Sequence, residues 1–179
     1  MASLTFVAPD SGILKTSLPP YPGKLTKAER KQLDRISDLL MDTPNAIAIA
    51  APQVGVPIRA FVVRNGGGTY VMVNPVVVWH SDSDPDEIIL GPGNTPIPRR
   101  SPSWERCLSI PDVEHLVIRP QLVKIEYSTI KDVRHRASYQ GFHARVVAHE
   151  VDHLNGILIS DVSNGHRSIE EGDGAEACM

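Results

Sequence analysis

The chain has 179 residues, which is the length of one ordinary domain with its own hydrophobic core. Its formal net charge of -3, with Lys and Arg residues that form no long run, argues against a nucleic-acid partner. No apolar run approaches the roughly 18–20 residues needed to span a bilayer. The first residues also lack the pattern of a secretory or transit signal. We therefore expect a cytoplasmic protein without a membrane partner.

Residues 26–42 predict an amphipathic helix. Apolar side chains recur at helical spacing at Leu33, Ile36, Leu39 and Leu40. Thr26, with Glu29 three residues later, matches a capping box at the start of the helix, and Pro44 closes the element.

Strands are predicted in the middle of the chain. The apolar, β-branched segments 58–63 and 70–78 flank an Asn-Gly-Gly-Gly sequence, which indicates a β-hairpin. Residues 80–103 are rich in Asp, Ser, Pro and Gly and predict a long surface loop. Two more strands are predicted at 116–118 and 122–127.

A second helix is predicted over residues 141–155. Its helical spacing places on one face Phe142, Val146, His149 and His153. After residue 161 the sequence is polar and acidic, which predicts a flexible tail. The expected organisation is one catalytic domain over residues 1–161 and a tail over residues 162–179.

The sequence His149-Glu150-Val151-Asp152-His153 is an H-E-x-x-H element, which in a helix projects both histidines toward one ion. The plain alternative is a pair of surface histidines beside solvated carboxylates. The residues around the element are apolar, namely Val146, Val147, Val151, Leu154 and Ile157. This face is therefore partly buried, where imidazoles and carboxylates are costly unless they are paired or bind a metal. A metal site is the better interpretation.

A catalytic metal of this kind needs a third protein ligand and an open position for water. A third histidine in the metzincin spacing would fall on Ile159, so that pattern fails. Glu170 and Glu171 lie in the polar tail. Cys107 is the better candidate because it lies in a short apolar-bounded segment and its thiolate binds borderline metals. The alternatives are an inert buried cysteine or a disulfide to Cys178, which would tether the tail.

Three separated segments carry a common pattern. They are Ala46-Ile47-Ala48-Ile49-Ala50-Ala51-Pro52-Gln53, Glu105-Arg106-Cys107-Leu108-Ser109 and His149-Glu150-Val151-Asp152-His153. In order and rough spacing they resemble G-x-G-x-A-A-x-Q, E-G-C-L-S and H-E-x-x-H, the signature motifs of the peptide deformylase family. The resemblance implies an α+β fold, with antiparallel β-sheets packed around a C-terminal metal-binding helix. It also implies a metal-dependent hydrolase that removes the N-formyl group from the initiator methionine of nascent polypeptides and releases formate.

The same resemblance assigns roles to individual residues. The metal ligands would be Cys107, His149 and His153, with water as the fourth ligand. Glu150 would take a proton from that water and deliver it to the leaving amine. Gln53 and the backbone N–H of Leu108 would stabilise charge on the formyl oxygen.

Substrate binding is assigned in the same way to Ile47, Ala48, Glu105 and Phe142, together with the stem of Arg145. For Phe142 and Arg145 a plain core or surface role is the alternative. The resemblance implies Fe²⁺ as the native metal, with Zn²⁺, Ni²⁺ or Co²⁺ also accommodated, whereas ligand chemistry alone favours zinc. The expected partners are formyl-methionyl peptides. Transient ribosome association is a further expectation, although the tail has no clear basic helix for docking.

Four positions depart from the family pattern. Ala46 and Ala48 replace glycines of the first motif, and Arg106 replaces the glycine of the second. Because alanine at positive φ costs about 1–2 kcal/mol, either the backbone there is ordinary or the substrate is held differently. Arg106 could favour the neighbouring thiolate, contact a substrate carboxylate or point to solvent. Glu114 stands where bacterial enzymes often carry an arginine that meets the peptide backbone.

These departures leave two alternatives to a deformylase. One is a related enzyme that acts on another N-acyl or amide substrate. The other is a non-catalytic metal-binding or ribosome-associated module.

Overall fold

The computed structural model describes residues 4–84, 86 and 88–169 of the chain. The two α-helices are α1 (Lys27–Asp42) and α2 (Phe142–Leu154), and the 3₁₀ turns are η1 (Gly12–Lys15), η2 (Ala51–Val54), η3 (Pro92–Asn94) and η4 (Ile159–Asp161). The strands are β1 (Ala48–Ala50), β2 (Ala60–Asn65), β3 (Gly68–His80), β4 (Arg100–Cys107), β5 (Ile110–Pro120), β6 (Leu122–Ser128), β7 (Arg134–Gln140) and β8 (His166–Ser168).

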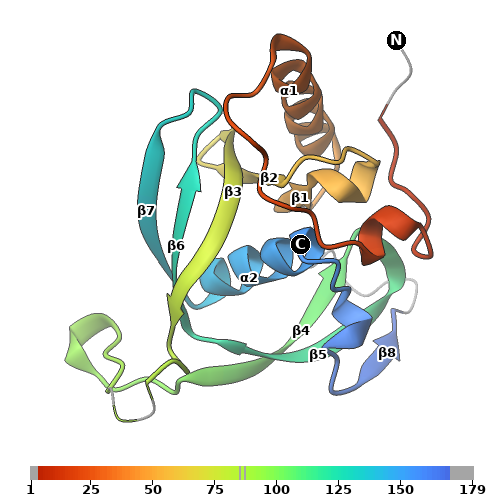
Figure 1. Ribbon diagram of the computed structural model, residues 1–179. Coiled ribbons are helices and arrows are strands. Elements are labelled where there is room, and N and C mark those ends of the chain that lie inside the picture. Colours follow the sequence, from red (N-terminus) through yellow and green to blue (C-terminus); the bar gives the residue numbers. More distant parts are fainter. Residues whose placement is uncertain (1–3, 85, 87, 170–179) are drawn as a thin grey trace.

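The strands form two antiparallel sheets with α2 between them (Figure 1). The larger sheet has the order β1-β2-β3-β6-β7, and the smaller has the order β4-β5-β8. Helix α1 packs against β1, β2 and β3. The expected α+β fold with antiparallel sheets around the C-terminal helix is therefore confirmed. None of the helices in the described residues is long and apolar enough to cross a membrane.

Helix α1 begins and ends where the sequence predicted. The Thr26 hydroxyl accepts the backbone N–H of Glu29 at 3.3 Å, and the Glu29 carboxylate accepts that of Thr26 at 2.7 Å, which completes the capping box. Its buried face consists of Leu33, Ile36 and Leu40. The predicted hairpin is confirmed as β2 and β3, which pair from Ala60 opposite Val73 to Asn65 opposite Gly68.

The predicted surface loop over residues 80–103 is wrong at its end, because β4 already begins at Arg100. Strand β7 was not predicted, since most of its residues are polar or charged and only Ala137 and Tyr139 are half-buried. Strand β8 pairs with β5 inside the segment that we expected to be a tail. The prediction of a tail therefore does not hold for residues 166–168. Residues 170–179, including Glu170, Glu171 and Cys178, lie outside the described residues.

Helix α2 is fixed at both ends and along one face. Its apolar face packs on the larger sheet through Ala144, Val147, Val151 and Leu154. Gly141 precedes the helix at φ 57°, a conformation that side chains with a Cβ avoid. Gly156 follows it at φ 74°, where a Cβ would lie 2.8 Å from the backbone of Lys15 and Thr16. The helix is thereby packed on the larger sheet, with its C-terminal end against Lys15 and Thr16.

Candidate metal centre

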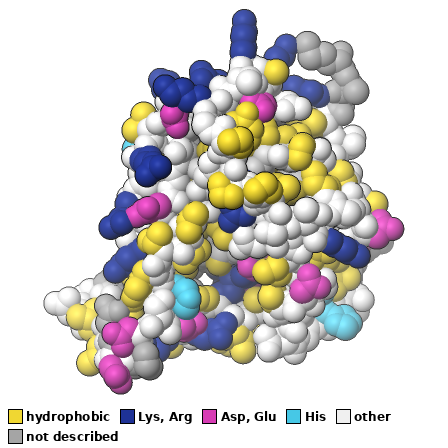
Figure 2. Space-filling view, in the orientation of Figure 1, with side chains coloured by type: hydrophobic (Ala, Val, Ile, Leu, Met, Phe, Trp, Pro, Cys, Tyr) yellow, Lys and Arg dark blue, Asp and Glu magenta, His cyan; other side chains and the backbone are white. Residues whose placement is uncertain are grey.

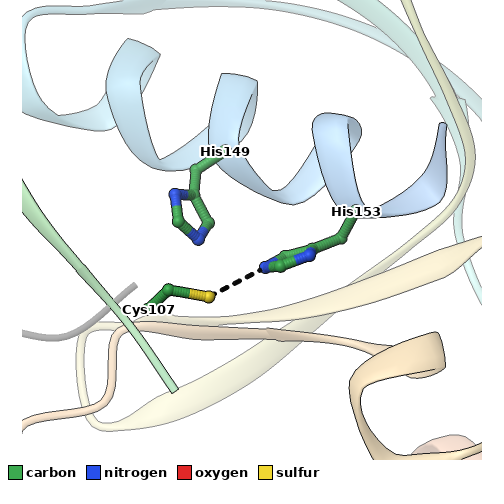
Figure 3. Close-up of side chains that lie close together, drawn as sticks. All are labelled: Cys107, His149 and His153. Atoms are coloured by element: carbon green, nitrogen blue, oxygen red, sulfur yellow. Dashed lines mark hydrogen bonds between the residues drawn. The ribbon is translucent and has the colours of Figure 1, made fainter. Parts of the chain in front are cut away.

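Cys107, His149 and His153, here called the metal group, come together between β4 and α2. The candidate ligand atoms of the three residues all lie within 4.8 Å of one another. Figure 3 shows both histidines pointing from α2 toward the cysteine, whose Sγ is 3.3 Å from His153 Nε2. Each side chain is at most 2% exposed. The structure thus unites the two motifs that the sequence proposed as sources of the metal ligands.

The unpartnered atoms of the metal group fit a divalent transition metal. His149 Nδ1 lies 3.2 Å from Glu105 Oε2, while His149 Nε2 is buried with no hydrogen-bond partner among the described residues. A proton on Nδ1, donated to Glu105, leaves the lone pair on Nε2 for a metal. One thiolate and two imidazoles form a donor set suited to such an ion.

The charges in the metal group are strongly coupled. Burial opposes ionisation of Cys107, but His153 and His149 outweigh it and hold the pKa of the thiol well below its usual range. Burial would lower the pKa of His149, but Cys107 and Glu105 outweigh it and raise that pKa to about 10. Protons thus balance the thiolate charge. A metal ion replaces these protons when it binds.

Glu150 lies beside the metal group as a fully buried acid. Both carboxylate oxygens are without a hydrogen-bond partner among the described residues. Burial raises the pKa of Glu150 to about 7, against the opposing effect of His149 and His153. A carboxyl group with this pKa can both accept and release a proton near neutral pH.

Gln53 presents its amide to the metal group in a fixed orientation. Its Oε1 accepts the backbone N–H of Ala50 at 2.7 Å, and its Nε2 donates to Ser109 Oγ at 3.1 Å. The same Nε2 lies 3.9 Å from Cys107 Sγ. Leu108 occupies the turn between β4 and β5, next to Cys107. The two expected oxyanion donors therefore flank the proposed metal ligand.

Glu105 was assigned to substrate binding, but the structure places it inside the protein. Its side chain is fully buried, and it accepts hydrogen bonds from Arg119 at 2.8 and 3.1 Å and from Arg145 at 2.6 Å. Arg119 also binds Asp152 at 2.7 Å. These contacts leave Glu105 to orient His149 instead of a substrate. Sequence reasoning missed Arg119 and Asp152, because their contact joins residues 33 positions apart and leaves no local signal in the sequence.

Replacing Glu105 by glutamine is expected to lower the metal affinity of the protein by about 10–100-fold. Glutamine keeps the shape of the side chain but removes the negative charge that holds the His149 Nδ1 proton and the two arginines. The measurement is competition for zinc between the protein and a chelator of known affinity. Glu126→Gln is the matched control, because that carboxylate pairs with Arg136 on the exposed face of β6 and β7. Equal affinities for both variants would remove Glu105 from this role.

The lowered pKa of Glu105 predicts how the stability of the protein depends on pH. Burial would raise the pKa of this carboxyl, but His149 and Arg119 outweigh it and lower it from 4.5 to about 2. Its contribution is therefore present above about pH 4.5 and is lost as the pH falls toward 2. A shift of this size corresponds to about 3 kcal/mol. Urea unfolding of the metal-free native chain should show a free energy of unfolding that falls between pH 4.5 and 2. In Glu105→Gln this part of the pH dependence should be absent.

Arg106 and Glu114 are bound to each other across β4 and β5. Arg106 Nε lies 2.7 Å from Glu114 Oε1, and Arg167 Nε of β8 lies 2.7 Å from Glu114 Oε2. Of the three roles considered for Arg106, a side chain that points to solvent is therefore not the one that the structure shows. Neither Ala46, Ala48 nor Arg106 has a positive φ. Of the two readings of these substitutions, an ordinary backbone is the one that the structure supports.

The remaining substrate-binding candidates lie near the start of α2. Ala48 is buried against Val146, and Ile47 packs on this pair. Phe142 is 48% exposed at the first residue of the helix. Arg145 is buried and tied to Glu105, so it is neither a surface residue nor a plain apolar core residue.

A separate pocket of about 450 Å³ lies between β3, the end of β5 and α2. Figure 2 shows the surface hollowed on this side of the molecule. Asp152 and Arg119 line the pocket, whereas the metal group does not. The pocket therefore borders the residues that support His149 and is distinct from the metal site.

Comparison with known proteins identifies the family of this chain. Residues 5–168 match the model of the family described as polypeptide deformylase. The chain belongs to the polypeptide deformylase family. It is 32% identical to a peptide deformylase of Desulfitobacterium hafniense over 161 residues, which cover 90% of this chain and 95% of that protein.

Solved structures of peptide deformylases share the fold. The crystal structure of the Thermotoga maritima enzyme matches with a TM-score of 0.75 and 26% identity. The match covers 92% of this chain and 100% of that chain. A Met-Ala-Ser-bound class I type b enzyme from Acinetobacter baumannii has a TM-score of 0.73 and 29% identity, over 90% of this chain and 98% of its own. This chain is thus a metal-dependent hydrolase that removes the N-formyl group from nascent peptides.

Proposed function

We propose that deformylation in this chain is carried out by the metal group together with Glu150, Gln53 and Leu108. The observation that carries the proposal is the buried, unpartnered Glu150 carboxyl beside three converging metal-ligand atoms. Such a group is costly to bury unless it acts on something that enters the site.

Cys107, His149 and His153 would hold one divalent ion and leave a position open. When bound, the ion supplies Lewis acidity, which lowers the pKa of a water toward about 7 and polarises a carbonyl. We propose Fe²⁺ as the native ion from the family resemblance, with Zn²⁺, Ni²⁺ or Co²⁺ able to replace it. Elemental analysis of protein prepared without oxygen tests this identity, and zinc as the main metal would contradict it.

Glu150 would move the proton during hydrolysis. The carboxylate takes a proton from the attacking water and passes it to the nitrogen of the scissile amide, whose C–N bond breaks. The products are formate and a free N-terminal amine. Burial raises the pKa of this carboxyl to about 7, so that both proton transfers are favourable near neutral pH.

Gln53 and Leu108 would stabilise the negative charge that develops on the formyl oxygen. The Gln53 amide is already oriented by Ala50 and Ser109, so its N–H group needs no rearrangement during the reaction. The Leu108 backbone N–H would be the second donor. The backbone of Ile47 and Ala48 would position the peptide, and Ile47 with Phe142 would contact the methionine side chain.

The remaining expectations concern the setting of the enzyme. We propose that it acts in the cytoplasm on formyl-methionyl peptides and associates with the ribosome only transiently. Its catalytic domain would include β8 in addition to the expected residues 1–161, because β8 pairs with β5. These assignments rest on the family and on the sequence.

A comparison of acyl groups tests the proposed substrate. The enzyme should hydrolyse a formyl-methionyl peptide, whereas the same peptide with an N-acetyl group should react far more slowly. Equal rates on both peptides would favour the alternative of a broader N-acyl hydrolase.

A further inference from the structure

Strand β8 brings a second pair of histidines together on the smaller sheet. His115 of β5 and His166 of β8 are direct partners in the antiparallel register. Strand β8 lies at the edge of the smaller sheet (Figure 1). Their ring centroids lie 6.1 Å apart, compared with 4.9 Å for His149 and His153. Direct cross-strand partners project from the same face with Cβ atoms roughly 4.5–5.5 Å apart. A small side-chain rotation therefore allows both imidazoles to reach one ion.

His115 is buried in a way that calls for a ligand. His115 is 6% exposed, and both of its ring nitrogens are buried without a hydrogen-bond partner among the described residues. Buried polar groups almost always have a partner, and a bound water or ion is one of the explanations for an exception. Burial and the neighbouring charge of His166 lower the pKa of His115, and they outweigh the opposing effects of Cys107 and Glu105. The imidazole is therefore neutral, which is the form that binds metals.

The arginines that bind Glu114 lie away from the histidine pair. Side chains alternate between the two faces of a strand, so Arg106, Glu114 and Arg167 lie on the opposite face from His115 and His166. Glu114 binds both of these arginines there. On the face of His115, its partner across β4 is Glu105, whose carboxylate is already bound by Arg119 and Arg145. No arginine of this cluster faces the histidine pair.

We propose that His115 and His166 form a second divalent-cation site, separate from the metal group. One imidazole would come from each strand, and water would complete the coordination. Imidazole ligands without thiolate or carboxylate favour zinc, nickel or copper over magnesium or calcium. Because β8 has only three residues, an ion at this site would fasten the C-terminal segment to the sheet that carries Cys107.

The test is the zinc content of the protein at saturating zinc. Zinc-loaded enzyme is dialysed against increasing free zinc and its metal content is measured, in a Cys178→Ser background so that this thiol cannot bind zinc. We expect two zinc ions per chain in this background and one after His166→Ala. Because His166 is exposed, this variant keeps the fold. His135→Ala, at an exposed histidine of β7, is the matched control and should still bind two.

A second readout locates the ion. Hydrogen exchange of the β8 backbone amides should slow when the second zinc binds, and this slowing should be absent in His166→Ala. A single zinc ion in the Cys178→Ser background would overturn the proposal. Two ions in His166→Ala, or one in His135→Ala, would also overturn it.

Discussion

Replacing Glu150 by glutamine is expected to lower kcat by about 10²–10⁴-fold. The substitution keeps the size of the buried side chain and removes the only carboxylate that lies unpartnered beside the metal group in the described part of the chain. Metal content should stay at one ion per chain under conditions that fill only the metal group, because Glu150 is not among the converging ligand atoms. Single-substrate kinetics and elemental analysis of the same preparation provide the measurement.

The control for Glu150 is Asp34→Asn, which changes an exposed carboxylate on α1 and should leave kcat unchanged. If Glu150→Gln retains full turnover with its metal bound, the assignment of proton transfer to this residue is wrong. Loss of the metal together with turnover would instead make Glu150 a structural support of the ligands.

Replacing Gln53 by alanine is expected to reduce kcat by about 10²–10³-fold with a smaller change in KM. The amide donor acts on charge that exists only in the transition state, so its loss affects the rate more than substrate binding. Comparison of kcat and KM with the native chain is the measurement.

The variant Ser109→Ala removes the hydrogen-bond acceptor of the Gln53 amide and leaves the amide itself in place. Ser109 accepts the Gln53 amide at 3.1 Å, and without it Gln53 keeps the hydrogen bond from Ala50 that orients its carbonyl oxygen. We expect Ser109→Ala to lose less activity than Gln53→Ala. An unchanged kcat in Gln53→Ala would remove this residue from the oxyanion site.

Local patterns in the sequence predicted the elements that position the metal group. The capping box and apolar stripe of α1, the glycine turn of the β2–β3 hairpin and the H-E-x-x-H spacing of α2 each lie within a few residues. Strand β7 could not be predicted from a local pattern. One of its faces is solvated, and its exposed polar residues give no strand signal.

The supporting contacts of the site depend on distant residues, so the sequence could not predict them. Glu105 meets Arg119, 14 residues away, and Arg145, 40 residues away, only after β4, β5 and α2 have packed together. The pairing of Arg106 with Glu114 likewise follows from the register of β4 and β5. A motif search identifies Glu105 as part of a signature, and only the fold shows that it serves His149.

The most direct test is formate release from formyl-Met-Ala-Ser by protein prepared without oxygen. We expect turnover that is lost when a chelator removes the metal and restored when Fe²⁺ is added, with Ni²⁺ or Co²⁺ also supporting activity. Native protein that carries the metal yet releases no formate with iron, nickel or cobalt would contradict the account.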